Sequence, residues 1–197
     1  VVVVQGNSES FWPPDSLADE QAQVLGAARR CFFVSKANWN LCELQIGHRL
    51  ANAEVVRNPF AVDYDAIASW PAESEIGLDL ACVGRLEPAG KGQDLLFEVL
   101  AMEKWRSRPV RVALYGGGQM ARSVRRMATM LGVQDRVSFA GYEEEIEQVW
   151  RNHHALVLPS RAEGLPLALV EAMLCHRAAI ATNVAGNAEV LEDNRTG

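Results

Sequence analysis

The chain has 197 residues, of which 49% are hydrophobic and 22% are charged. These proportions are ordinary for a globular protein and exclude a mainly disordered chain, and the length suffices for one large domain or two modest ones. The formal net charge of −6 argues against a general affinity for nucleic acid, whose phosphates require clustered Lys and Arg.

The cysteines and the apolar runs bear on the cellular compartment. The four cysteines show no C-x-x-C spacing and lie in apolar periodic segments, so we predict reduced core thiols. No run approaches the length of a membrane span, and the opening VVVV lacks the flanks of a signal peptide. We expect a cytoplasmic protein, and leave open a peripheral association of the full-length protein with the inner face of a membrane.

The N-terminal part of the chain alternates strands and helices. Hydrophobic periodicity predicts strands over residues 1–5, 31–35 and 53–57, and helices over residues 15–29 and 37–50. Residues 58–78 then show no sustained period and are acidic, which indicates a linker. Because the first residue is not Met and the last residues follow closely on a helix start, we interpret the sequence as an internal fragment of a longer protein.

From residue 79 the alternation restarts and predicts a second domain. Its predicted strands are residues 79–83, 110–115, 136–140, 155–158 and 179–183. The predicted helices begin at Asp94, end at Gly132, cover residues 144–152, begin at Pro166 and begin at a cap on Asn187. Helical crossovers between five strands require a mostly parallel, Rossmann-like α/β sheet with helices on both faces. Ligands of such sheets bind beyond the carboxyl ends of the strands.

The loop after the first of these strands reads GRLEPAGKGQD. Arg85 comes directly after Gly84, and Lys91 lies between two glycines just before a helix. Glycine permits close backbone approach, and a helix N-terminus beside Arg and Lys suits a diphosphate. The alternative is that Arg85 pairs with Glu87 and that Lys91 is a solvated loop residue.

The loop after the second strand reads GGGQMA. It matches the G-x-G-x-x-A form of the dinucleotide-binding fingerprint at Gly116, Gly118 and Ala121. The acidic residue expected at the tip of the next strand is not cleanly placed, because Glu143 comes late. We therefore predict a glycine-rich loop that approaches a nucleotide, without a complete NAD fingerprint.

The segment PSRAEGLPLALVEAM carries Glu163 where the chain leaves the fourth strand and Glu171 within the following helix. The N–H groups near Gly164 and Leu165 would face an anion or sugar hydroxyls. Two carboxylates at different depths could bind hydroxyls of two different sugars. The alternative for each glutamate alone is an ordinary solvated or helix-start residue.

In this order, these motifs and the closing GNAEVLEDNRTG resemble the C-terminal donor domain of glycosyltransferase family 4, which has the GT-B fold. The segments VSKANWN and AEVVRNPF are similar to the end of that family's N-terminal acceptor domain. The resemblance implies a partial acceptor domain over residues 1–57, a linker over 58–78, and a nucleotide-sugar-binding domain over 79–197 that is truncated at its C-terminus.

The resemblance also implies a reaction, the retaining transfer of a hexose from a UDP-sugar or GDP-sugar to an acceptor hydroxyl, with no metal and no other cofactor. Arg85 and Lys91 would neutralise the diphosphate and stabilise the charge on the leaving group, and Glu163 would lie beside the donor sugar. Glu171 would accept hydrogen bonds from the ribose. The implied donor-binding positions are Gly84, Gly116, Gly118, Gly164, Leu165 and Glu171.

The acceptor stays open between a saccharide, a lipid-linked saccharide and a small molecule, because the N-terminal half that reads it is largely missing. We expect the fragment to bind donor but to be inactive alone. Two other classes of protein are open: an NAD-binding oxidoreductase or regulatory module, and a non-catalytic interaction domain.

Three further signals are given structural interpretations. Asp63 and Asp65 resemble a metal-binding acidic pair but lie in the linker, where a turn is expected. His153 and His154 are adjacent, so their side chains diverge and do not chelate one ion. The tryptophans predicted to pack on helices are Trp39, Trp105 and Trp150.

Overall fold

A computed structural model describes residues 1–4, 6–71, 77–193 and 195–196. Residue 5 of the first predicted strand, residues 72–76 of the predicted linker and residues 194 and 197 lie outside the described residues. The chain forms two compact units. The first comprises Val1–Pro59, Ala162–Leu167 and Asn183–Glu192, and the second comprises Phe60–Arg161, Ala168–Thr182 and Asp193–Gly197. The predicted domain boundaries stay a prediction.

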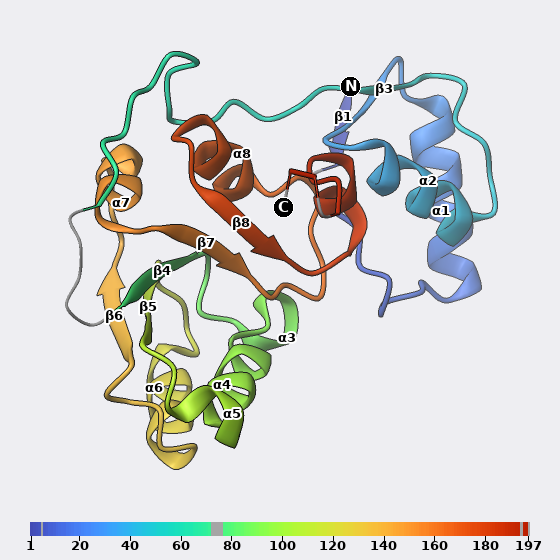
Figure 1. Ribbon diagram of the computed structural model, residues 1–197. Coiled ribbons are helices and arrows are strands. Elements are labelled where there is room, and N and C mark those ends of the chain that lie inside the picture. The colour runs from blue at the N-terminus through green and yellow to red at the C-terminus, as the bar shows by residue number, and fades with distance from the viewer. Residues whose placement is uncertain (5, 72–76, 194, 197) are drawn as a thin grey trace. The chain divides into compact units, whose positions relative to one another are not determined.

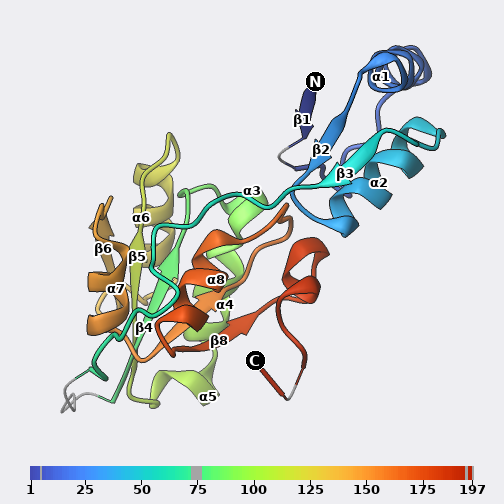
Figure 2. The ribbon, with the colours of Figure 1, turned by 90° about the horizontal axis from the view of Figure 1, so that it is seen from above.

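The first unit contains a three-stranded parallel sheet in the order β1-β2-β3. Its strands are β1 (Val2–Val4), β2 (Cys31–Phe33) and β3 (Ala53–Val55). Helices α1 (Asp15–Ala27) and α2 (Lys36–Ile46) lie on the same side of the strands (Figure 2). Right-handed crossovers that advance in one direction place both helices on one face. The core between them contains Leu25, Cys31, Phe33, Cys42, Ile46 and Leu50.

Helix α2 begins and ends at residues with capping geometry. The Ser35 Oγ accepts a hydrogen bond from the Asn38 N–H at 3.1 Å, which makes Ser35 an N-cap. Gly47 follows the helix with a φ of 62°, the left-handed conformation that ends many helices. The predicted continuation of this helix to residue 50 is therefore wrong.

The helix that the sequence predicts with a cap at Asn187 is instead a short 3-10 helix, η1 (Ala185–Glu189), which contains Asn187. It packs against α2 within the first unit. The Glu189 carboxylate accepts hydrogen bonds from the N–H groups of Lys36 at 3.2 Å and Ala37 at 2.5 Å. Because a carboxylate satisfies the free donors at a helix start, a tertiary contact holds this segment, where a local cap was predicted.

The second unit contains a five-stranded sheet in the order β6-β5-β4-β7-β8, in which all neighbours are parallel. The strands are β4 (Leu78–Val83), β5 (Val110–Tyr115), β6 (Val137–Gly141), β7 (Ala155–Leu158) and β8 (Ala178–Ala181). The helices are α3 (Pro88–Lys91), α4 (Gln93–Ala101), α5 (Glu103–Arg106), α6 (Ala121–Met130), α7 (Ile146–Asn152) and α8 (Leu167–Leu174).

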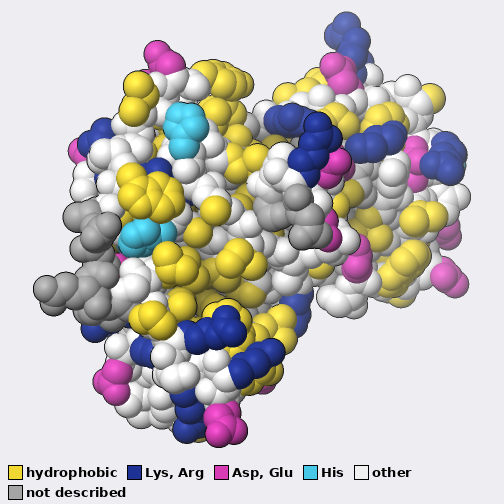
Figure 3. All heavy atoms as spheres, in the orientation of Figure 1, with side chains coloured by type: hydrophobic (Ala, Val, Ile, Leu, Met, Phe, Trp, Pro, Cys, Tyr) yellow, Lys and Arg dark blue, Asp and Glu magenta, His cyan; other side chains and the backbone are white. Residues whose placement is uncertain are grey.

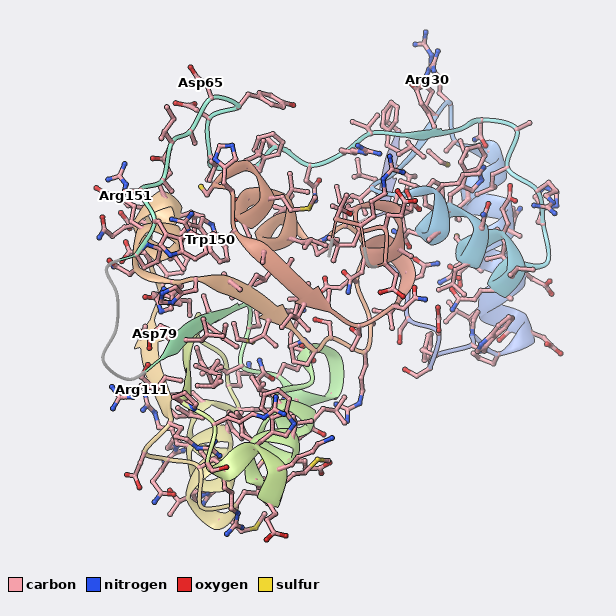
Figure 4. All side chains as sticks on the ribbon, in the orientation of Figure 1. Arg30, Asp65, Asp79, Arg111, Trp150 and Arg151 are labelled. Carbon is pink, nitrogen blue, oxygen red and sulfur yellow. The ribbon has the colours of Figure 1, made fainter. Side chains whose placement is uncertain are left out.

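Helices cover both faces of this sheet, with α4 and α6 on one face and α7 and α8 on the other (Figure 1). The strand order explains the arrangement, because β5 and β6 lie on one side of β4 while β7 and β8 lie on the other, and right-handed crossovers then place their helices on opposite faces. Phe97 and Val124 are fully buried on the first face. On the second, Trp150 of α7 lies inward and its neighbour Arg151 points outward (Figure 4). The predicted α/β fold class, a Rossmann-like sheet preceded by a smaller α/β unit, is confirmed.

Helix α3 was not predicted, and the helix predicted from Asp94 is divided into α4 and α5. Pro88 occupies the first position of α3, which suits proline because that N–H needs no partner. A distant side chain stabilises helix α5, because the Arg136 guanidinium donates to the carbonyl of Trp105 at 2.8 Å and to that of Leu100. The α3 turn also moves the start of the next helix to Gln93, one residue before the predicted Asp94.

Residues 60–71 of the predicted linker are packed on the second unit. Val62, Ala66 and Ala68 are buried there. The residue that holds them is Arg177, which lies in the turn between α8 and β8 and is 4% exposed. Its guanidinium donates to the carbonyls of Trp150 at 2.6 Å, His153 and Cys175 at 2.9 Å each, Ala68 at 3.3 Å, and Ser69. The linker is thus fastened to the ends of α7 and α8.

In the described part of the chain, no helix is long and apolar enough to cross a membrane. The four cysteines are buried thiols outside any disulfide, as predicted. Trp39, Trp105 and Trp150 lie on helices α2, α5 and α7, also as predicted.

Candidate functional site

The candidate site begins between the neighbouring parallel strands β4 and β7, where the connections after the two strands run to opposite faces of the second sheet. The chain leaving β4 passes to α4 on one face of the sheet, and the chain leaving β7 passes to α8 on the other (Figure 1). Loops that diverge in this way leave a crevice at the carboxyl ends of the strands, which is the usual ligand site of an α/β sheet.

The loop after β4 brings Gly84, Arg85 and Lys91 together. A Cβ added at Gly84 would lie 3.6 Å from the Cδ of Lys91, so the aliphatic part of Lys91 rests beside the strand end. Arg85 is exposed, and its Nη2 lies 3.5 Å from Glu87 Oε2. The Arg85–Glu87 pairing considered as an alternative is therefore present. Because both partners are exposed, the pair contributes little to stability and leaves the guanidinium able to turn toward an anion.

A bidentate ion pair that the sequence analysis missed fastens this loop to the loop after β7. The Arg161 Nη1 and Nη2 each lie 2.7 Å from an Asp94 carboxylate oxygen. Arg161 also donates to the carbonyls of Gly90 and Pro88, both at 2.8 Å. The Arg161 guanidinium holds the pKa of Asp94 below its ordinary value. Since Lys91 lies between these attachments, contacts across the sheet set its position.

The glycine-rich loop after β5 packs directly on the loop after β4. Gly116 has a φ of 123°, and a Cβ there would lie 2.2 Å from the Gly84 carbonyl oxygen. A Cβ at Gly118 would lie 2.8 Å from the Leu86 carbonyl oxygen. Both glycines are therefore required by the contact between the two loops. Their predicted contact with a nucleotide stays a prediction.

A matched pair of substitutions tests this packing. We expect Gly116→Ala to lower the free energy of unfolding by about 1–3 kcal/mol, because the left-handed backbone and the Gly84 carbonyl both oppose a Cβ. Gly117→Ala is the control, since nothing lies within 4 Å of a Cβ added there. Urea unfolding of both variants measures the difference, and an equal effect of the two substitutions would contradict the packing argument.

A cavity of about 240 Å³ lies at the carboxyl ends of β4, β5 and β6. Its lining combines backbone of the glycine loops with Arg85, Tyr115, Tyr142, Glu143 and Ile146. Glu143, which comes later in the sequence than the acidic residue of a dinucleotide fingerprint, is one of the residues that line this cavity. Apolar walls with a few charged groups are typical of a site for a small molecule.

Glu171 lies on α8 and is 6% exposed. Its Oε1 accepts a hydrogen bond from the Ala61 N–H at 3.0 Å. Burial raises the pKa of Glu171, and this hydrogen bond opposes the rise. The solvated alternative for Glu171 is wrong, because the carboxylate is buried.

The raised pKa predicts how the stability of Glu171→Gln depends on pH. The folded carboxyl binds its proton more tightly than the unfolded one, so its contribution to stability is present below the unfolded pKa and lost as the pH rises through the folded pKa. At pH 7 we expect Glu171→Gln to be about 1 kcal/mol more stable than the wild type, with a Tm roughly 2–4 °C higher. The gain should vanish near pH 4. Thermal unfolding of both proteins between pH 4 and pH 7 measures it, and a gain that does not change with pH would refute the argument.

The other predicted residues belong to the first unit. Glu163 is buried there at 8% exposure, and its alternative as an ordinary residue near a helix start stays a prediction. A Cβ at Gly186 would lie 2.2 Å from the Gly164 carbonyl oxygen, which makes Gly186 necessary for this loop. In the described part of the chain, the main-chain N–H groups of Gly164 and Leu165 make no turn, loop or cap hydrogen bond to a main-chain carbonyl. The roles predicted for these residues stay predictions.

The acidic pair in the predicted linker and the two adjacent histidines each make local structural contacts. The Ala66 N–H donates to the Asp63 carbonyl at 3.1 Å, which closes a turn, and Asp65 points outward from it (Figure 4). The His153 ring packs edge-on against Tyr115, whereas the His154 Nδ1 accepts from the Asp79 N–H at 3.1 Å. Across the described residues, no group of three or more His, Cys, Asp or Glu could hold a metal ion. On the face seen in Figure 3, basic and acidic side chains are interspersed.

Comparison with known proteins supplies the family context. The family model described as glycosyl transferases group 1 matches residues 77–197. A GDP-mannose-dependent alpha-(1-6)-phosphatidylinositol monomannoside mannosyltransferase of Mycolicibacterium smegmatis is 32% identical over 153 residues, covering 70% of this chain and 39% of the relative. A D-inositol 3-phosphate glycosyltransferase of Gordonia bronchialis is 31% identical over 154 residues, covering 68% of this chain and 33% of the relative.

Solved structures agree in fold. The crystal structure of Anabaena HepE in complex with UDP-glucose superposes with a TM-score of 0.77 at 23% identity, covering 97% of this chain and 55% of that one. A glycosyltransferase from Rickettsia africae gives a TM-score of 0.78 at 17% identity, covering 100% of this chain and 55% of that one. The chain spans less than half the length of the two curated relatives named above.

Proposed function

The chain belongs to the group 1 glycosyltransferases, and on that premise we propose that it carries the donor site of an enzyme that moves a hexose from a nucleoside diphosphate sugar to an acceptor hydroxyl with retention. The observation that carries the proposal is the convergence of Arg85, Lys91 and a cavity at the carboxyl ends of β4, β5 and β6. Cationic side chains beside a cavity with apolar walls suit a diphosphate that is attached to a base.

In this proposal the diphosphate lies over the loop after β4. Arg85 and Lys91 neutralise it and stabilise the negative charge that grows on the leaving nucleoside diphosphate as the glycosidic bond breaks. Glu163 and the N–H groups of Gly164 and Leu165 hold the donor sugar. The guanidinium of Arg85 and the ammonium of Lys91 together supply the positive charge that a divalent cation would otherwise supply, so the proposal requires no metal.

The nucleoside occupies the other half of the site. The cavity between Gly84, Gly116 and Tyr142 is the proposed base subsite, because Arg85 is one of its lining residues. Glu171 accepts the ribose hydroxyls. Relatives whose names specify GDP-mannose and structures that contain UDP-glucose support a nucleotide sugar as the donor class and leave the base to experiment.

Calorimetric titration of the chain with UDP, GDP and NAD tests the proposal. We expect UDP or GDP to bind and NAD to bind at least tenfold more weakly. Binding of NAD alone would overturn the proposal in favour of the dinucleotide-binding alternative. Absence of binding by all three ligands, in a sample that remains folded by circular dichroism, would favour a non-catalytic interaction domain.

A further inference from the structure

The buried carboxylate of Glu171 has one hydrogen-bond donor among the described residues, the main-chain N–H of Ala61 at 3.0 Å. An ionised carboxylate has about four acceptor positions, and buried polar groups normally use theirs. Glu171 therefore retains acceptor capacity after Ala61 has bound Oε1. That unused capacity lies on α8, the helix that follows the loop after β7.

The donor, Ala61, belongs to the segment predicted as a linker, yet it is fixed in place. Val62, one residue later, is 5% exposed, and Ala68 is 7% exposed. Further along, the Arg177 guanidinium holds the carbonyls of Ala68 and Ser69. The segment is thus attached to the second unit on both sides of its Asp63–Ala66 turn. These contacts, together with the hydrogen bond to Glu171, place the N–H of the exposed Ala61 beside α8.

We propose that Ala61 is a positioning residue for nucleotide binding, whose N–H orients the Glu171 carboxylate so that Oε2 accepts from the ribose hydroxyls. This inference rests on the proposed function. The N–H fixes one oxygen of the carboxylate and stabilises its ionised form inside a buried site. An oriented acceptor loses little freedom when the ribose binds. The linker therefore forms part of the ribose subsite and contributes through its backbone, without a side chain.

The proposal makes a prediction about ribose selectivity that a merely structural role does not make. A carboxylate oriented toward ribose hydroxyls distinguishes UDP from 2′-deoxy-UDP, and GDP from 2′-deoxy-GDP. Removal of the Ala61 N–H should weaken binding of the ribonucleotide about tenfold, the scale of one charge-assisted hydrogen bond, and leave binding of the deoxynucleotide nearly unchanged. General disruption of the site would weaken both nucleotides alike.

The experiment compares Ala61→Pro, which lacks the N–H, with Ala61→Gly, which keeps it. Calorimetric titration with the four nucleotides should show lost ribose selectivity in Ala61→Pro and wild-type selectivity in Ala61→Gly. Because proline also restricts Phe60, a second variant carries lactic acid at position 61, which replaces the amide by an ester and removes the N–H alone. Circular dichroism identifies any variant that does not fold.

Combination with Glu171→Gln tests the route of action. In a Glu171→Gln background, loss of the Ala61 N–H should change ribose selectivity by less than twofold, because the oriented carboxylate is already absent. Wild-type selectivity in the ester variant, or equal weakening of both nucleotides, would overturn the inference while leaving the proposed function intact. Failure of the wild-type chain to bind UDP or GDP would overturn both together.

Discussion

Replacing Lys91 by Met is expected to weaken the binding of UDP or GDP to this chain by roughly tenfold to a hundredfold, the effect of losing one hydrogen bond between charged groups. Lys91 ends α3, and its aliphatic part rests beside Gly84 at the end of β4. Methionine keeps most of that apolar contact and removes the ammonium. The loss should therefore be electrostatic, and it should shrink as the salt concentration rises.

Matched ligands and a matched variant sharpen this test. Uridine and guanosine lack the diphosphate, so their affinities should be the same for the wild type and for Lys91→Met. Lys104→Met removes an exposed ammonium on α5 and should bind UDP and GDP as the wild type does. Equal weakening of nucleoside and nucleotide binding by Lys91→Met would show that the residue supports the loop and does not bind the diphosphate.

The sequence predicts the strands of both sheets well because their signals are local. Apolar runs such as ALVL of β7 and VRVALY of β5 stand between turns with glycine and proline, and helical periods separate them. Because the sequence predicts parallel strands in the second sheet, the loops after β4 and β7 are expected at one edge. Gly84, Arg85 and Lys91 lie there within a single loop.

The features that the sequence did not predict depend on contacts between distant residues. The partners Arg161 and Asp94 are 67 positions apart, and Ala61 and Glu171 are 110 apart. The conformation of residues 185–189 depends on α2, whose first N–H groups bind Glu189. No local pattern marks such pairs. The acidic, aperiodic composition of residues 58–78 even indicated a linker where Val62, Ala66 and Ala68 are packed.

The glycine-rich loop shows how one pattern can have two physical causes. The residues GGGQMA match a nucleotide fingerprint, and Gly116 would be required whether a ligand or a protein backbone approached it. The structure shows a protein backbone there, the carbonyl of Gly84. A glycine spacing predicts close approach, and the chemistry of what approaches has to come from neighbouring residues such as Arg85 and Glu143.

Replacing Arg177 by Met is expected to lower the free energy of unfolding by about 3 kcal/mol or more, because several buried carbonyls lose their donor together. For a chain of this length the Tm should fall by roughly 6–12 °C. The Arg177 guanidinium forms no ion pair with a carboxylate of the described residues. Carbonyls at the ends of α7 and α8 surround it, where the helix dipoles favour a cation, and the Trp70 ring lies 5.2 Å away.

Thermal unfolding followed by circular dichroism measures this loss, with Arg111→Met as the control. Arg111 is exposed at the amino end of β5 (Figure 4), so its replacement should change stability by no more than about 0.5 kcal/mol. Burial lowers the pKa of Arg177, yet a guanidinium stays protonated throughout the accessible range. The difference between the two variants should therefore be the same at pH 6 and pH 8. A loss for Arg177→Met no larger than that for Arg111→Met would mean that the linker carbonyls are satisfied by water, and that the Arg177 guanidinium does not hold residues 68 and 69 to the second unit.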